Sequence, residues 1–480
     1  MTSKGQPVSE SVIRLMSRLA IQHDAVNLSQ GFPNEPPMPE GVSSLVCGLL
    51  GGTPDRQAEL ASSSVGDLLQ AVASREGKDP KDLSLSSFLE SIVSSHPIDM
   101  HSQYSMPVGR PVMRQAVSSY YERFYPGKRG GAGIDPETEI TITLGATEAM
   151  AAVLRALLVP GDGVLVMEPF HELYPSQAGV FHLRALFTRL REIDGEWTMD
   201  FADIATKMKE CRAMVLCDPH NPTGKVFTVS ELRILCRLCI ENDCYLLGDD
   251  IYEHMIFQGD EEGGAKLTHF LVGRDTETIL TPEAGFSEEE VEKMKGLYLI
   301  LNSVSKTWSA TGWRCGWVIS PPAVTGAIRA VHDQMVMQCP TPIQIGCEAL
   351  LNRAPTEFYT KMAKKYEERR DFLCGELEKI GFRLAWPRAA YYAFVRYTEV
   401  PALAEFHGRP RDAALFLLKE YKVACVPGDN FFFLEGEKEK ASEAERGAGG
   451  HAPTDYLRFC FCRRLDDLKE AVRRLQKLKA

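Results

Sequence analysis

The sequence lacks several features that would place it in particular protein classes. It has no apolar run long enough to span a bilayer, and it lacks an excess of positive charge. Its formal net charge of −11 argues against a general nucleic-acid binder. The start, MTSKGQPVSESVIRLMSRLA, lacks the apolar core and cleavage site of a secretory signal. We therefore expect a cytoplasmic protein that binds neither membranes nor nucleic acid; the arginines and serines of this start leave an organellar location open.

Cysteine pairs at metal-binding spacing are also scarce. The chain has 13 cysteines, of which Cys236 and Cys239 have CxxC spacing without a second pair at zinc spacing. Both lie in the helical pattern SELRILCRLCIEND, and others lie in apolar strings such as RFCFC. A reduced cysteine in such a string packs as a small core residue. The sequence therefore predicts buried thiols and no metal site.

What the chain does contain is a long alternation of apolar runs and amphipathic segments. At 480 residues with 44% hydrophobic content, it is long enough for two domains. Between about residues 139 and 320 the apolar runs are EITITL, GVLVME, RAMVLCD, CYLLGDD and LYLILNS. Such runs are typical of strands buried on both faces of a mostly parallel sheet. The alternation predicts an α/β domain with helices on both sides of the sheet.

The rest of the chain follows a different pattern. Beyond residue 325, helical patterns alternate with the short strands YYAFVRY and YLRFCFC, which indicates a smaller α+β domain. Three polar stretches interrupt the order, near residues 48–98, 258–296 and 434–452. Their serine, glycine and charged residues predict surface insertions.

Glycine, hydroxyl and charged residues follow the apolar runs. The carboxyl ends of parallel strands meet at one edge of a sheet, where ligands bind. The residues that follow the five runs are, in order, Gly145, Ala146 and Thr147; Phe170 and His171; Asp218, His220 and Asn221; Asp249, Asp250 and Tyr252; and Ser303, Lys306 and Arg314. We expect these groups to form one site.

One half of this predicted site suits a phosphate. The glycine turn at residue 145 opens a helix, whose first N–H groups and positive dipole end attract anions. The hydroxyl of Ser303 and the guanidinium of Arg314 can complete such a site, because arginine binds phosphate through two parallel hydrogen bonds.

The other half suits a substituted pyridine ring. Phe170 offers a flat face, and Asp249 can pair with a ring cation. Tyr252 and Asn221 can donate to a phenolate oxygen, and Lys306 can form an imine with an aldehyde. Together the two halves match pyridoxal phosphate.

Motifs along almost the whole chain carry a family resemblance. They are LSQGFPNEPP, QYSMPVGRPVMRQAV, TLGATEA, EPFHELY, DPHNPTGKVF, DDIYEHM, SVSKTWSATGWRCGW, VPGDNFF and YLRFCF. In this order they resemble the fold-type I, class I/II pyridoxal-phosphate-dependent aminotransferases, in the branch of the kynurenine and glutamine–phenylpyruvate enzymes. The resemblance implies an aspartate-aminotransferase-like α/β fold with a mainly parallel seven-stranded sheet. It places the large domain at 99–325 and the small domain at 1–47 and 326–480.

The resemblance also implies roles for individual residues. Lys306 is similar to the Schiff-base lysine that shuttles the proton, and Asp249 to the carboxylate that keeps the pyridine nitrogen protonated. Tyr252 and Asn221 resemble the pair that holds the phenolate oxygen, and Phe170 resembles the ring that stacks on the cofactor.

The phosphate, partner and substrate contacts follow in the same way. The resemblance assigns the phosphate to Ala146, Thr147, Ser303 and Arg314. Tyr104 resembles a tyrosine that reaches the phosphate of the neighbouring subunit, which implies a homodimer with shared active sites. Gly31, Asn221 and Arg458 resemble the residues that hold the substrate carboxylate. Next to the cofactor, we expect His171 and His220 to act as hydrogen-bonding residues.

The implied reaction is a ping-pong transfer of an amino group from an L-amino acid to a 2-oxo acid. Aromatic amino acids, kynurenine, methionine and glutamine are the donors that the resemblance favours. Two alternatives stay open at this point. One is a lyase on the same cofactor, either a C–S β-lyase or an enzyme like aminocyclopropane-carboxylate synthase. The other is a non-catalytic relative that acts as a binding module.

Overall fold

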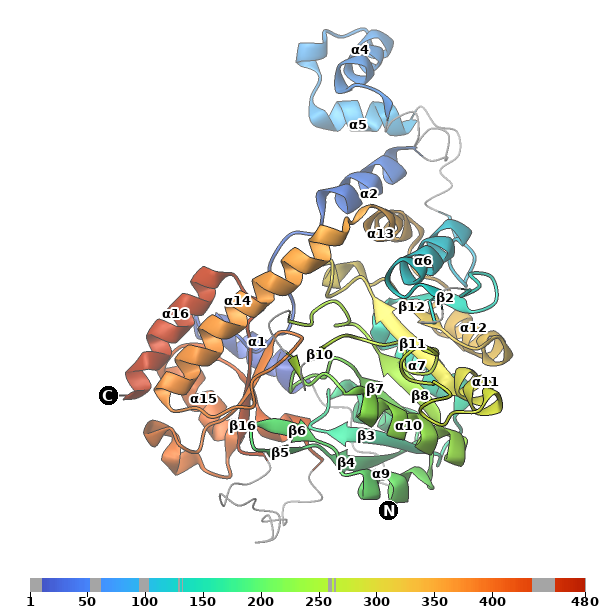
Figure 1. Ribbon diagram of the computed structural model, residues 1–480. Coiled ribbons are helices and arrows are strands. Elements are labelled where there is room, and N and C mark those ends of the chain that lie inside the picture. Colours follow the sequence, from blue (N-terminus) through green and yellow to red (C-terminus); the bar gives the residue numbers. More distant parts are fainter. Residues whose placement is uncertain are drawn as a thin grey trace.

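Figure 1 shows the computed structural model of the protein, in which a large sheet-based body carries a smaller domain and a projecting group of helices. The structure describes residues 11–51, 62–94, 103–127, 130–131, 133–257, 261–262, 265–433 and 454–479. The predicted insertion at 434–452 lies outside the described residues, as do parts of those at 48–98 and 258–296. Among the described helices, none combines the length and the apolar character needed to cross a membrane.

The body is built on a mainly parallel seven-stranded sheet, as predicted. Its strands in spatial order are β2 (Ile140–Thr143), β12 (Gly316–Ile319), β11 (Tyr298–Ser303), β8 (Tyr245–Asp249), β7 (Cys211–Cys217), β3 (Gly163–Glu168) and β4 (Arg184–Arg189). Strand β12 runs antiparallel to both of its neighbours, and the remaining neighbours are parallel. The five apolar runs of the sequence are therefore β2, β3, β7, β8 and β11.

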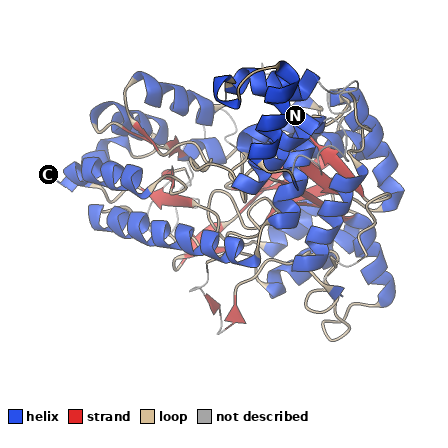
Figure 2. Ribbon diagram, turned by 90° about the horizontal axis from the view of Figure 1, so that it is seen from above, coloured by secondary structure: helices blue, strands red, loops and turns tan. Residues whose placement is uncertain are grey.

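Both faces of this sheet are buried, which explains why the runs are continuously apolar. Val164 and Val166 of β3 point to one core, whereas Leu165 and Met167 point to the other. The first face is covered by α7 (Gly145–Leu157), α8 (Leu173–Val180) and α12 (Pro322–Val336). The second face is covered by α6 (Pro111–Phe124), α9 (Phe201–Met208), α10 (Val229–Asn242) and α11 (Glu288–Leu297). Figure 2 shows helices packed around the strands.

The smaller domain combines both ends of the chain. Its antiparallel sheet has the order β13 (Tyr392–Arg396), β16 (Tyr456–Cys460) and β15 (Val426–Pro427). Near the N-terminus, β1 (Val26–Asn27) pairs in parallel with β14 (Val423–Ala424). The helices of this region are α1 (Val12–Gln22), α15 (Pro410–Glu420) and α16 (Leu465–Leu475). This pairing brings the segment around Gly31 next to the C-terminal strands.

One long helix, α14 (Thr356–Ile380), spans the two domains (Figure 1). Near its start, Tyr359 accepts a hydrogen bond from Arg123 of the body, whereas Leu373 and Leu377 near its end pack in the core shared with the smaller domain. Helix α12 packs on α7, and α13 (Thr341–Arg353) packs on α6. The helices α12 and α13, which follow or span the predicted boundary near residue 325, therefore both pack on helices of the body.

The predicted insertion at 48–98 is helical where the structure describes it. Helix α2 (Pro39–Gly51) packs on α13, and beyond it α4 (Val65–Glu76), η1 (Pro80–Asp82) and α5 (Leu85–Ser94) project from the body (Figure 1). These helices enclose a small core around Val72 and Ile92. The Ser64 hydroxyl caps α4 by accepting from the Asp67 N–H, and Gly77 ends it at a φ of 65°.

The stretch at 258–296 is only partly a surface insertion. It contains a hairpin of β9 (Glu261–Glu262) and β10 (Ala265–Lys266), followed by the buried side chains of Leu271, Val272 and Ile279. The described ranges also contain short elements: the hairpin β5 (Arg191–Ile193) with β6 (Glu196–Thr198), and the 3-10 turns η3 (Thr311–Trp313), η4 (Pro401–Phe406), η5 (Gly428–Phe431) and η6 (Gln476–Lys479).

Candidate active site

Lys306 lies in the loop that follows β11, at the edge of the sheet where ligands bind. Its side chain is partly buried, and its Nζ donates a hydrogen bond of 2.7 Å to the backbone oxygen of Gly31. Burial, together with the nearby cations of Arg458 and Arg314, lowers the pKa of Lys306 to about 8, although Asp249 opposes this shift. Such an amine is neutral, and therefore nucleophilic, in a much larger fraction of molecules than an ordinary lysine.

Asp249 ends β8 in the same region and is buried. Its Oδ2 accepts a hydrogen bond of 2.6 Å from the Tyr174 hydroxyl, whereas its buried Oδ1 has no hydrogen-bond partner among the described residues. Burial raises the pKa of Asp249 to about 6. A buried carboxylate oxygen without a donor is costly, and a protonated ring nitrogen would supply the missing N–H. The residues present therefore fit a pyridinium.

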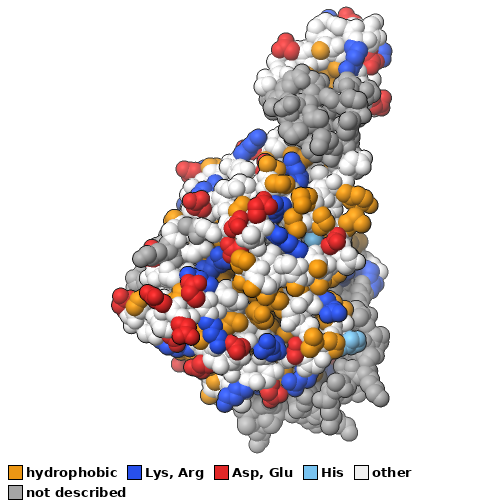
Figure 3. Space-filling model, turned by 90° about the vertical axis from the view of Figure 1, so that its right-hand side faces the viewer, with side chains coloured by type: hydrophobic (Ala, Val, Ile, Leu, Met, Phe, Trp, Pro, Cys, Tyr) orange, Lys and Arg blue, Asp and Glu red, His pale blue; other side chains and the backbone are white. Residues whose placement is uncertain are grey.

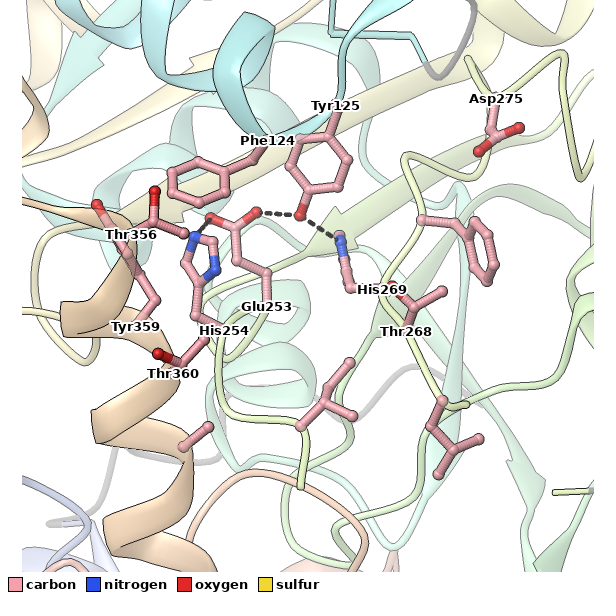
Figure 4. Close-up of a pocket in the computed structure, with 14 residues that line it drawn as sticks. Phe124, Tyr125, Glu253, His254, Thr268, His269, Asp275, Thr356, Tyr359 and Thr360 are labelled. Atoms are coloured by element: carbon pink, nitrogen blue, oxygen red, sulfur yellow. Dashed lines mark hydrogen bonds and ion pairs between the residues drawn. The ribbon is translucent and has the colours of Figure 1, made fainter. Parts of the chain in front are cut away.

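A buried polar network fixes the turn that follows Asp249. Glu253 accepts hydrogen bonds from Asn302 at 2.6 Å and from Tyr125 at 2.6 Å. The Tyr125 hydroxyl lies 2.8 Å from His269 Nδ1, and His269 Nε2 lies 3.6 Å from Asp250 Oδ1. Figure 4 shows Glu253, Tyr125 and His269 beside a cavity of about 470 Å³. Because Asp250 within the Asp249–Tyr252 turn and Glu253 directly after it both belong to this network, the turn has a fixed position.

Arg458 connects several of the predicted site residues. Arg458 donates through Nη1 to Asn221 Oδ1 and through Nη2 to the backbone oxygen of Ser29, each at 3.0 Å. The guanidinium lies 4.3 Å from the centre of the Tyr392 ring, and its buried Nε has no partner within the part of the chain described. The Tyr252 hydroxyl lies 2.9 Å from the Tyr392 hydroxyl. An unpaired N–H on a buried arginine suits a carboxylate ligand.

The predicted phosphate groups also come together. Arg314 has a φ of 51°, and its Nη2 donates to the backbone oxygen of Leu144 at 3.3 Å. Gly145 has a φ of 76°, and a Cβ on it would lie 2.7 Å from Arg314 Nη2. Glycine is therefore required where the arginine crosses the start of α7. Residues Ala146 and Thr147 form the first turn of this helix.

The third predicted phosphate group, Ser303, is buried at the end of β11. Its Oγ accepts a hydrogen bond of 3.3 Å from the backbone N–H of Ser305. The Ser303 hydroxyl proton is not used in that bond, so it can be donated to an anion.

Phe170, which the sequence predicts as the ring that stacks on the cofactor, and its neighbour His171 lie in different surroundings. Phe170 is buried in the core, where its ring centre lies 5.4 Å from that of Phe187. His171 instead places its ring edge-to-face with Tyr174, the residue that donates to Asp249. Burial and the charges of Arg458 and Lys306 lower the pKa of His171 to about 3. His171 is thus a neutral imidazole near Arg458 and Lys306, whereas Phe170 packs against Phe187.

The remaining predicted residues lie as follows. Tyr104 is 77% exposed and lies on the outer surface. Gly31 packs against the Tyr392 hydroxyl and accepts the hydrogen bond from Lys306. His220 Nδ1 pairs with Thr223 Oγ1 at 2.8 Å, so it stabilises the turn that presents Asn221. Burial lowers the pKa of His220 to about 3.

Comparison with known proteins adds independent information. The model of the family described as aminotransferase class I and II matches residues 84–475. Kynurenine–oxoglutarate transaminase 3 of Bos taurus is 28% identical over 405 residues, which cover 78% of this chain and 79% of that protein. Human kynurenine–oxoglutarate transaminase 1 is 25% identical over 485 aligned positions, which cover 96% of this chain and 94% of that protein.

A solved structure extends this similarity to the fold. N-Succinyldiaminopimelate aminotransferase from Mycobacterium tuberculosis superposes with a TM-score of 0.73 at 23% identity, covering 98% of this chain and 100% of that chain. At this identity the likeness bears on the fold alone.

Proposed function

The chain belongs to the class I and II aminotransferase family, and from this premise we propose which residues perform its reaction and which substrates it takes. It is an enzyme of fold type I, in a family that uses pyridoxal phosphate. Bound pyridoxal phosphate supplies an aldehyde and a ring that accepts the electron pair left when a substrate Cα–H loses its proton. The proposals below concern what the residues of this chain contribute.

We assign the covalent attachment and the proton transfer to Lys306. Its partly buried amine, with a pKa of about 8, attacks the aldehyde in its neutral form and later moves a proton to and from the substrate Cα. Asp249 pairs with the protonated ring nitrogen, and its unpaired Oδ1 is the single observation that best carries the proposal. Tyr252 and Asn221 donate to the phenolate oxygen, and the imidazole of His171 covers one face of the ring.

The phosphate and the substrate carboxylate bind at opposite ends of this site. The phosphate is held by the backbone of Ala146 and Thr147 at the start of α7, with Ser303 and Arg314. The carboxylate of the amino acid is held by Arg458, whose Nε lacks a partner within the described ranges, and by Asn221 beneath the Gly31 segment. Both contacts orient the Cα–H toward Lys306.

We propose that the donor is an aromatic amino acid, kynurenine, methionine or glutamine, and that the acceptor is a 2-oxo acid. The two transaminases named above carry kynurenine and oxoglutarate in their names, which supports this choice. They also favour amino transfer over the lyase reaction and over a non-catalytic role. The reaction follows a ping-pong order, because donor and acceptor use the same carboxylate site in turn.

A second copy of the chain is proposed to complete the site. Exposed apolar side chains lie just before α6, at its start, and at the end of α12. A hydrogen bond of 2.7 Å from the Ser105 hydroxyl to Gln338 joins these two regions. The exposed side chains are Tyr104, Met106, Val112, Met335 and Met337. Figure 3 shows hydrophobic side chains gathered on this side of the molecule. Apolar clusters of this kind mark interfaces, which supports a homodimer in which Tyr104 reaches the partner.

A cytoplasmic location completes the proposal. All 13 cysteines are free thiols, and all except the partly buried Cys47 are buried. A chain rich in free thiols suits a reducing compartment.

The test is a panel of amino donors against pyruvate, 2-oxoglutarate and phenylpyruvate, with the purified protein supplied with pyridoxal phosphate. The proposal expects a new amino acid and a 2-oxo acid in equal amounts, and no product from Lys306→Ala. Pyruvate and ammonia formed from a β-substituted cysteine without any acceptor would instead establish a lyase. Wild-type protein that binds no pyridoxal phosphate would overturn the whole proposal.

A further inference from the structure

Tyr392 opens β13 beneath the proposed site, and its side chain is fully enclosed. Its hydroxyl lies 2.9 Å from the hydroxyl of Tyr252, and the two rings meet edge-to-face with centres 5.9 Å apart. This contact joins a residue of the smaller domain to the turn that follows β8.

Two further contacts fix the position of Tyr392. The guanidinium of Arg458 lies over its ring, 4.3 Å from the centre. On the other side, a Cβ at Gly31 would lie 2.0 Å from the Tyr392 hydroxyl oxygen, so the N-terminal segment closes over this hydroxyl. The backbone oxygen of Gly31 also accepts from Lys306. Tyr392 is therefore enclosed by residues that we assign to the substrate carboxylate, the phenolate and the amine.

We propose that Tyr392 is a positioning residue whose hydroxyl donates to the Tyr252 oxygen and so directs the Tyr252 proton to the cofactor phenolate, while its ring holds the guanidinium of Arg458. This inference rests on the proposed function. A tyrosine hydroxyl has one proton to donate. If Tyr252 donated to Tyr392, its oxygen would face the phenolate without a proton between them. Donation by Tyr392 avoids that repulsion.

Burial keeps both hydroxyl protons in place. It raises the pKa of Tyr392 to about 12 and the pKa of Tyr252 well above its ordinary value. Both groups therefore act as neutral donors over the working pH range. Successive hydrogen bonds also polarise one another, so the bond from Tyr392 strengthens the one that Tyr252 donates.

The two parts of the Tyr392 side chain predict separable effects. The Tyr392 hydroxyl acts on the phenolate through Tyr252. Without it, Tyr252 donates more weakly, the phenolate oxygen keeps more negative charge, and that charge retains the proton on the nitrogen of cofactor-bound Lys306. The ring acts on Arg458 and hence on binding of the amino-acid carboxylate. Tyr392→Phe removes only the hydroxyl, whereas Tyr392→Leu also removes the aromatic face.

The experiment measures, for each holoenzyme, the pH midpoint of the absorbance change of the lysine-bound cofactor, together with kcat and KM. For Tyr392→Phe we expect the midpoint to rise by roughly half to one pH unit and kcat to fall about threefold to tenfold, the size of one net hydrogen bond. KM should stay within about twofold, because ring–guanidinium contact is retained. Tyr392→Leu should show the same midpoint shift and a KM raised by about threefold or more.

Two controls make the result specific. Tyr397→Phe removes a buried hydroxyl that donates to Phe406 O at 2.8 Å, outside the site, and should leave the midpoint unchanged. In a Tyr252→Phe background, adding Tyr392→Phe should produce no further shift, because Tyr392 acts through Tyr252.

An unchanged midpoint in both Tyr392 variants, with normal wild-type activity, would overturn the role of Tyr392 and leave the proposed function intact. A further shift in the Tyr252→Phe background would also overturn it. Wild-type enzyme without a lysine-bound cofactor would instead overturn the proposed function, and the inference with it.

Discussion

Lys306 Nζ donates to the backbone oxygen of Gly31 at 2.7 Å, a contact between residues 275 positions apart in the chain. It ties the loop after β11 to the N-terminal segment that lies over the site. Since the amine is partly buried next to two arginines, its proton is held more weakly than in water. The N-terminal segment is thus in direct contact with the amine whose pKa is lowered.

The first prediction concerns the pH dependence of cofactor attachment. In the proposed reaction Lys306 attacks an aldehyde only when neutral, and its pKa is about 8. The rate of absorbance change after adding pyridoxal phosphate to cofactor-free protein should therefore rise with pH through a midpoint near 8 and then level off. Lys306→Ala should show no lysine-bound absorbance at any pH. A wild-type rate that continues to rise tenfold per pH unit up to pH 10 would contradict the assignment.

The second prediction separates Asp249 from its neighbour Asp250. Asp249→Asn removes the charge that we propose pairs with the ring nitrogen. A charge-assisted bond contributes roughly 1.5–3 kcal/mol, so kcat should fall about 10- to 100-fold. Asp250→Asn, which removes the carboxylate next to His269, should mainly lower the melting temperature. The readouts are kcat and thermal unfolding of both variants. A larger loss of kcat in Asp250→Asn than in Asp249→Asn would reverse the two roles.

Much of the site could be predicted because it depends on strand ends. Each apolar run became a strand buried on both faces, and parallel strands bring the residues after them to one edge. The proximity of Lys306 and Asp249 can therefore be predicted without any knowledge of the tertiary contacts.

Other features had no sequence signal of this kind. Which of Phe170 and His171 turns inward depends on packing: Phe187 and the backbone of Phe431 occupy one side of the turn. Tyr392 belongs to the smaller domain, 140 residues along the chain from Tyr252. Its position in the run YYAFVRY predicts only ordinary packing within a strand. The composition of the stretch 48–98 indicated an exposed segment but no helices. Helices α4 and α5 form there because local capping and a small apolar core stabilise them.

The third prediction concerns recognition of the substrate carboxylate. The planar guanidinium of Arg458 is fixed in position by its hydrogen bonds to Asn221 and Ser29. Lysine cannot reproduce the two parallel N–H donors that a guanidinium offers to a carboxylate. Arg458→Lys should raise KM for the amino donor about 10- to 100-fold, with a smaller change in kcat. Arg464→Lys, at an exposed position nearby, is the matched control and should leave KM unchanged. Equal effects of both substitutions would show that the loss does not depend on a guanidinium at position 458, which would contradict the assignment of Arg458 to the carboxylate.

The last prediction concerns stability and follows from the network behind the Asp249–Tyr252 turn. Burial alone would lower the pKa of His269, but the carboxylates of Asp250, Asp218 and Glu253 outweigh it and raise the pKa to about 9. The ordinary value is 6.5, so the folded state binds the proton more tightly than the unfolded state does. The stabilisation is fully present below pH 6.5 and is lost as pH rises through 9.

Urea unfolding at pH 6.5 and pH 9.5 tests this sign. The wild type should be less stable at the higher pH by on the order of 3 kcal/mol from this group alone. His269→Gln should be less stable than the wild type at pH 6.5, because it leaves the buried carboxylates without their cation, and its stability should change less between the two pH values. His182→Gln alters a histidine that does not line this cavity, and it should retain the wild-type dependence. If His269→Gln also retained the wild-type dependence, His269 would not be the group that titrates.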